Sequence, residues 1–287
     1  MKTAKKVWII VAVCLIVSGT IIGALSLAKV NYDFVNLSTE NFISNEHNIT
    51  EDFSNIKIDV KTSDIDFVRS QTDECMVVSI DTEKVKHNVS VENDTLLIVV
   101  EDNREWYDYI GIFHGENSLT INLPKDYYDS LDIEADTSDI IISKNLSFGT
   151  ATIKTDTGDV EFVASVSEKL DIKTDTGEIE IGDADILGND YKYINLKSST
   201  GDIKLWHIVA REKITVQNST GDVWFGMVNA SYVSVKTSTG DAEGNLYTAP
   251  KFITKPSTGD VNVPKAQTDD IFEITTSTGD INFKVVK

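Results

Sequence analysis

A short turn motif, Thr-Gly-Asp or Thr-Gly-Glu, recurs seven times in the second half of the chain and constrains the fold more than any other feature. The steps between its glycines are 19, 24, 20, 19, 19 and 20 residues. These glycines are Gly158, Gly177, Gly201, Gly221, Gly240, Gly259 and Gly279. A fixed period of this length is typical of a solenoid, in which each repeat is one coil that buries its apolar face against its neighbours.

The flanks of each turn follow the same rule. Apolar residues occupy the fifth and seventh positions before the glycine and the second and fourth after it, as Leu170, Ile172, Ile179 and Ile181 do around Gly177. Such alternation puts one face of a strand in the core and the other in water. Each coil is therefore predicted to be a strand, a tight turn, a second strand and a looser return loop.

Some positions of the repeat depart from this rule in instructive ways. The Gly240 coil is the weakest, with Ala242 and Gly244 after its turn. Ser63 and Ser138 replace the glycine in two further copies. The third position before the glycine is small or polar, so we expect its hydroxyl to bond to turn backbone. We predict an all-β, two-sheet β-solenoid with about 20 residues per rung over residues 119–287.

The N-terminus has the pattern of a membrane anchor. Lys2, Lys5 and Lys6 precede 22 uncharged, mainly apolar residues, 7–28, and Lys29 follows. About 20 apolar residues are needed for a helix to cross a bilayer core. We expect residues 1–30 to form a cytoplasmic tip and a transmembrane helix, with the remainder outside. A cleavable signal peptide, ending near residue 28, is the alternative.

The charge of the exported part limits its partners. Residues 31–287 carry 22 basic and 46 acidic residues, a formal net charge of −24. Such a surface repels nucleic acid, so no nucleic-acid partner is expected. Cys75 is the one cysteine outside the apolar span, which excludes an internal disulfide there.

Two less regular pieces precede the array. Residues 31–50 are polar and aperiodic, which predicts a stalk. Residues 51–118 are predicted to form an N-terminal β cap with one degenerate repeat, including a hairpin that turns at Asn93 and Asp94. The other end of the array shows no cap before its final lysines.

The segment between Asn103 and Asn117 is unusually aromatic. Its candidate ligand-binding residues are Trp106, Tyr107, Tyr109, Phe113 and His114. Exposed rings would stack on sugars or on a partner protein. Alternatively, the rings pack onto the cap.

The strand and turns that follow the aromatic segment resemble those of a known family. The strand Ile121-Asn122-Leu123-Pro124, followed by rungs with turns such as Thr137-Ser138-Asp139-Ile140, resembles the bacterial putative-adhesin family of uncharacterised surface domains. Some of its relatives are Lia-type membrane-anchored proteins of cell-envelope stress systems. The resemblance covers roughly residues 50–287. It implies a surface domain and brings no catalytic motif.

Stacked turns would align their acidic residues about 4.8 Å apart. Neighbouring carboxylates at that spacing repel by about 0.9 kcal/mol in a water-like dielectric. Calcium, which takes six to eight oxygens, would relieve this repulsion. The alternative is that the carboxylates bond to turn backbone. The candidate metal ligands are Asp159, Asp202, Asp222, Asp241, Asp260 and Asp280.

These features favour a non-catalytic surface or envelope binding module whose protein or glycan partner the sequence does not name. The histidines fall at unrelated places in the repeat, and no nucleophile or phosphate-binding motif occurs. A carbohydrate-active β-helix enzyme is the rival, but Arg211 is the one arginine available from residue 119 onward to bind acidic sugar. A passive spacer is the third interpretation.

Overall fold

The structure is a computed structural model that describes residues 2–29, 41–106, 117–184 and 189–286. Its helix α1 (Lys2–Lys29) has 28 residues. Judged by length and hydropathy, no helix within these residues qualifies as a membrane span. The expected membrane anchor therefore stays a prediction.

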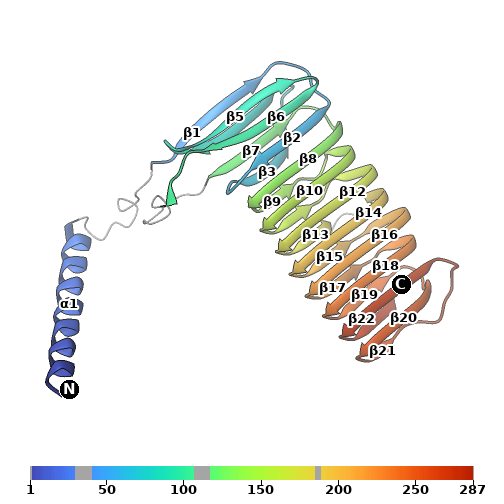
Figure 1. The fold of residues 1–287 in the computed structure, drawn as a ribbon. Coiled ribbons are helices and arrows are strands. Elements are labelled where there is room, and N and C mark those ends of the chain that lie inside the picture. Colours follow the sequence, from blue (N-terminus) through green and yellow to red (C-terminus); the bar gives the residue numbers. More distant parts are fainter. Residues whose placement is uncertain (1, 30–40, 107–116, 185–188, 287) are drawn as a thin grey trace.

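The described residues after α1 form two sheets, of 12 and 11 strands, that face each other along a stack of coils (Figure 1). In spatial order the 12-stranded sheet contains β1 (Ile43–Ile49), β4 (Cys75–Asp81), β7 (Ser118–Leu123), β3 (Asp64–Arg69), β9 (Ile140–Ile142), β11 (Val160–Phe162), β13 (Ile179–Gly182), β15 (Ile203–Trp206), β17 (Val223–Gly226), β19 (Ala242–Leu246), β23 (Ile281–Val285) and β21 (Val261–Asn262). The 11-stranded sheet contains β20 (Lys251–Thr258), β22 (Ile271–Thr278), β18 (Asn229–Thr239), β16 (Ile208–Thr220), β14 (Asn189–Thr200), β12 (Ser165–Thr176), β10 (Ser147–Thr157), β8 (Tyr127–Thr137), β2 (Asn55–Val60), β6 (Thr95–Asp102) and β5 (Val85–Glu92).

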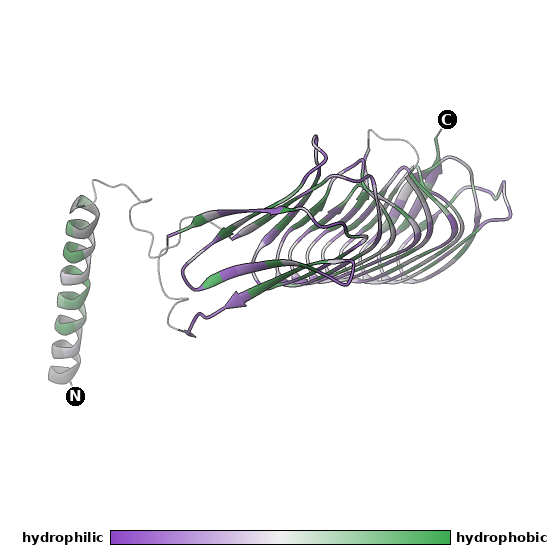
Figure 2. Cartoon of the chain, turned by 90° about the horizontal axis from the view of Figure 1, so that it is seen from above, coloured by the Kyte–Doolittle hydropathy of each residue, from purple (hydrophilic) through white to green (hydrophobic). Residues whose placement is uncertain are grey.

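Equivalent positions of successive coils pair in parallel register and are buried in columns. Ile153, Ile172 and Leu196 form part of one column in the 11-stranded sheet. Val160 and Ile179 form part of the facing column in the 12-stranded sheet. The predicted two-sheet solenoid is confirmed, and so are its buried positions except in the coil of β20 and β21, where Val261 is 43% exposed. In Figure 2 the coils lie behind one another, and hydrophilic and hydrophobic segments alternate along them.

Packing explains why a small residue, Gly244, follows the turn of the weak Gly240 coil. Gly244 pairs with Phe225 on one side and with Phe283 on the other. The rings of these two phenylalanines meet with their centroids 5.8 Å apart. A Cβ on Gly244 would lie 2.7 Å from the Cβ of Phe225. A larger residue at position 244 would therefore displace the phenylalanine rings that pack in the core.

The coils do not stack in the order of the sequence at either end. The last coil, β22 with β23, lies between the β18–β19 coil and the β20–β21 coil. Likewise, β2 with β3 lies between β8–β9 and the coil of β6 and β7. The edge of the array is thus β20 and β21, and the C-terminal strand β23 that was expected at that edge is paired on both sides.

The N-terminal end is closed by antiparallel strands. β5 pairs with β6 in a hairpin whose Asn93 and Asp94 have φ of 49° and 62°, which confirms the predicted turn. β1 pairs with β4, which pairs with β7. Residues 43–49, expected to belong to the polar stalk, are strand β1 instead, because their backbone completes this antiparallel edge. Residues 30–40 of the expected stalk lie outside the described residues.

Candidate functional site

The turns are joined by a ladder of hydrogen bonds from backbone to carboxylate. The N–H of Asp159 donates to Asp139 Oδ1 at 2.8 Å, and the N–H of Asp222 donates to Asp202 Oδ1 at 2.8 Å. Glu178 differs, because its Oε1 lies 2.6 Å from Lys204 Nζ. The aspartate carboxylate at this position therefore accepts a hydrogen bond from the backbone N–H of the next turn. This is the result expected if the carboxylates bond to turn backbone.

Glycine is required in these turns for two reasons. Gly221 has a φ of +129°, and a Cβ on it would lie 2.2 Å from the carbonyl oxygen of Gly201. The third position before the glycine is buried in six of the seven turns, as Thr174 and Asn218 are, and the exception is the half-buried Pro256. Asn218 Nδ2 donates to the carbonyls of both Gly201 and Gly221. The expected hydroxyl bond to turn backbone is confirmed for Thr155, Thr174, Ser198 and Thr276, whereas Thr237 Oγ1 has no hydrogen-bond partner.

The same geometry bears on calcium. Of the candidate ligands, Asp159, Asp202, Asp222, Asp241 and Asp280 already use one carboxylate oxygen for a neighbouring N–H, whereas Asp260 takes part in the ladder through its backbone N–H. Across the described residues, no group of three or more His, Cys, Asp or Glu side chains is arranged to hold a metal ion. Calcium binding at the turn carboxylates stays a prediction.

Ser63, His87 and Asp81 form a hydrogen-bonded chain in the cap that sequence reasoning missed. Ser63 Oγ lies 2.8 Å from His87 Nε2, and His87 Nδ1 lies 2.6 Å from Asp81 Oδ1. Serine hydrolases use the same order of groups. However, the exposed fraction of Ser63 is 0% and that of His87 is 3%, so a substrate carbonyl does not reach the hydroxyl in this conformation. The arrangement satisfies polar groups that the cap buries.

The aromatic segment lies between β6 and β7 in the sequence. Arg104 at its start makes two hydrogen bonds to the Asp102 carboxylate, which hold the pKa of that carboxyl below its usual value. Trp106 is 75% exposed. The other candidate ligand-binding residues, Tyr107, Tyr109, Phe113 and His114, lie outside the described residues, so the proposed ring surface stays a prediction.

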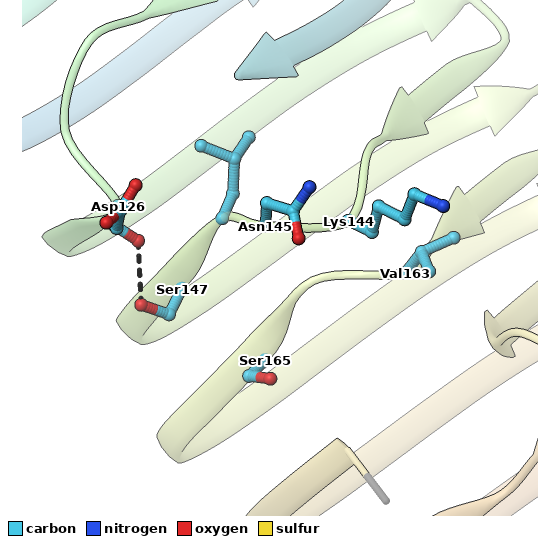
Figure 3. A pocket seen from close by; sticks show the side chains of 7 residues that line it. Asp126, Lys144, Asn145, Ser147, Val163 and Ser165 are labelled. Carbon is cyan, nitrogen blue, oxygen red and sulfur yellow. Dashed lines mark hydrogen bonds between the residues drawn. The ribbon is translucent and has the colours of Figure 1, made fainter. Parts of the chain in front are cut away.

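An open groove of about 600 Å³, lined by polar side chains and by Leu146 and Val163, runs along the return loops of the β8, β10 and β12 coils (Figure 3). Ser147 Oγ donates to the carbonyl of Asp126 at 2.8 Å on its wall. Lys144 and Asn145 line the same groove, and Asn145 has a φ of 68°. Hydroxyl, amide, ammonium and carboxylate groups therefore share one open surface.

A second pocket, of about 300 Å³, lies on the outer face of the 12-stranded sheet. It contains Trp206 of β15 and Trp224 of β17, with ring centroids 6.2 Å apart. Sequence reasoning tracked inward positions and passed over this pair. The available signal was two tryptophans at outward positions of consecutive coils.

The comparisons with known proteins match this architecture. A family model described as Toastrack DUF4097 matches residues 53–190 and 182–287. The chain belongs to the Toastrack DUF4097 family. The resemblance to putative-adhesin surface domains is thereby confirmed at the level of an uncharacterised surface-domain family, and the Lia-type relationship stays a prediction.

Solved structures share the Toastrack fold. A putative adhesin from Parabacteroides distasonis aligns with a TM-score of 0.53 and 14% identity over 86% of this chain and 98% of its own. A putative adhesin from Parabacteroides merdae aligns with a TM-score of 0.50 and 15% identity over 86% and 98%. At these identities the likeness concerns the fold alone. No curated protein matches the Toastrack chain.

Proposed function

We propose that this Toastrack protein is a non-catalytic binding module of the cell surface, held at the membrane by its N-terminal helix. The observation that carries the proposal is the parallel register of the coils, because it repeats every outward position about 4.8 Å further along the rod. Such columns suit contact with an extended ligand. Family membership and the description of the structural neighbours as putative adhesins support a surface role.

The anchoring part of the proposal rests on the sequence. Residues 7–28 carry no charge, and the lysines before them favour a cytoplasmic N-terminus. The envelope-stress role rests on the Lia-type resemblance. Fractionation with carbonate washing tests the anchor, and protease added to intact cells tests exposure of the solenoid. Recovery of the protein in the carbonate wash would contradict the anchor. Resistance of the solenoid to protease on intact cells would contradict its exposure.

Binding is tested with the full chain, in a non-ionic detergent, on an array of cell-envelope glycans and on membranes from the same cells. The proposal expects saturable binding without release of reducing ends. If the aromatic segment carries the contact, changing Trp106 and Tyr109 to alanine removes the signal, whereas unchanged binding excludes that segment.

The same experiment separates the other two functions. Release of reducing ends from a polysaccharide would establish the carbohydrate-active enzyme and overturn the non-catalytic proposal. Failure to bind any glycan or membrane partner, with the chain folded, would favour the passive spacer.

A further inference from the structure

The pocket on the outer sheet face is an aromatic corner, defined here as Trp206 and Trp224. The two ring planes meet at 50°, and both side chains are partly exposed. Trp224 pairs in register with Lys204 on one side and with Glu243 on the other. The rings therefore form two walls of an open site rather than part of the core.

The backbone is shaped to hold one of these rings. Gly226 pairs with Trp206, and a Cβ on Gly226 would lie 2.2 Å from Trp206 Cε3. The φ of Gly226 is outside the left-handed region, so its backbone conformation does not demand glycine. The close approach of the indole supplies the reason, and the ring lies against the sheet with glycine beneath it.

The charges around the aromatic corner are predominantly negative. Asp202, Asp222 and Glu243 line the pocket. Lys204 also lines it, but its ammonium lies 2.6 Å from Glu178 Oε1 and is therefore neutralised by that carboxylate.

Two glutamates beside the aromatic corner have a raised pKa, and burial is the main cause for both. Burial, followed by the charges of Asp241, Asp222 and Asp280, raises the pKa of Glu243. Burial also raises the pKa of Glu180, which neighbours Trp206. A cation entering the corner would be attracted by these carboxylates, whereas an anion would be repelled.

We propose that the aromatic corner binds a quaternary ammonium ligand, with the methyl groups against the faces of Trp206 and Trp224 and the charge facing Asp222 and Glu243. Tryptophan faces attract cations through their quadrupole, and quaternary ammonium groups are recognised by aromatic walls of this kind. Methylated nitrogen contacts the rings without losing hydrogen bonds to water. This inference names a ligand class within the proposed binding function and rests on it.

The test is a fluorescence titration of the full chain, in a non-ionic detergent, with choline as the probe. Trp8→Phe and Trp106→Phe are introduced first, so that the remaining signal comes from the aromatic corner. The matched control is 3,3-dimethylbutanol, which has the shape of choline without its charge. We expect saturable binding of choline, and binding of the neutral analogue at least about tenfold weaker.

Three variants locate the site. Trp224→Leu is expected to weaken choline binding by about tenfold or more, and Glu243→Gln by about threefold. Gly226→Ala is expected to weaken it by displacing the Trp206 ring. Glu243→Gln keeps the rings and the outward position, so it remains informative if the other two variants fold poorly.

Equal binding of choline and dimethylbutanol would overturn the proposal, since it would show an apolar site. Unchanged affinity in the folded Glu243→Gln variant, or no saturable response in the folded parent, would also overturn it. These failures are distinguishable from failure of the binding module. Glycan or membrane binding that persists in Trp224→Leu would leave the module intact and place its ligand elsewhere.

Discussion

The backbone N–H of Asp280 donates to Asp241 Oδ1 at 2.7 Å, although 39 residues separate the two. Asp260, which lies between them in the sequence, donates instead to Asp280 Oδ1. The last coil of the chain is therefore inserted one place before the end of the stack. As a result the chain terminus is paired on both sides, and the coil of β20 and β21 carries the exposed edge.

Pro256 protects that edge from pairing with another molecule. The N–H of Lys251 donates to Asp270, and since N–H directions alternate along a strand, position 256 faces away from β22. Proline removes a donor there, which is one way in which sheets avoid edge association. Pro256→Thr, which introduces the residue found at the equivalent position 237, is predicted to increase self-association in sedimentation velocity. A variant that stays as monodisperse as the parent would show that proline has no such role.

Gly221 is predicted to be intolerant of alanine. Both its positive φ and the 2.2 Å approach to the Gly201 carbonyl oppose a Cβ. Gly221→Ala should reduce the free energy of unfolding by more than about 3 kcal/mol in urea titrations. The matched control is Ser138→Ala at a turn without positive φ, which should change it by less than about 0.5 kcal/mol. Similar values for the two variants would contradict the turn geometry.

Asp222 distinguishes the hydrogen-bond ladder from a calcium site. Its Oδ1 accepts the N–H of Asp241 at 2.8 Å. Asp222→Ala should cost about 1 kcal/mol, whereas Asp222→Asn keeps an acceptor, removes like-charge repulsion and should be neutral or stabilising. The measurement is thermal unfolding with calcium or with chelator. A calcium-dependent rise in Tm that Asp222→Asn abolishes would establish a metal role for the turn carboxylates.

Glu243 should make stability fall as the pH rises above the ordinary glutamate range. The pKa of Glu243 in the folded chain is raised above its usual value of 4.5. Between the usual and the raised pKa, the folded state therefore binds more protons than the unfolded state. Glu243→Gln is therefore predicted to raise Tm by on the order of 1 °C at pH 7 and to leave it unchanged near pH 4. A variant that is less stable than the parent at pH 7 would contradict this sign.

The sequence predicts the coil because the same alternation surrounds most of the turns, from Ile153 to Ile281. It does not predict the order of the coils at the two ends, because each coil presents equivalent apolar faces and turns to any neighbour. The contacts that do fix the order are specific, such as Phe283 meeting Phe225 across Gly244. They become visible only once the coils are placed.

The candidate sites show the same contrast between what the repeat predicts and what depends on the placement of the strands. The turn carboxylates were found because they share the period of the repeat. Trp206 and Trp224 were missed since they occupy outward positions that differ by two residues within their coils. The contact of Ser63 with His87 depends on the antiparallel strands of the cap, whose pairing the repeat does not specify.

The place of the last coil, between the β18–β19 coil and the edge, rests on the order of the coils, and paired cysteines test that order most directly. Thr275 pairs in register with Lys236 and also with Lys255, so Lys236 and Lys255 lie two strands apart. Neighbouring strands are about 4.8 Å apart, within disulfide range, whereas a separation of two strands is outside it. In a Cys14→Ser background, Lys236→Cys with Thr275→Cys should cross-link on oxidation, and Lys236→Cys with Lys255→Cys should not. The reverse result would show that the coils follow the order of the sequence and would contradict this account.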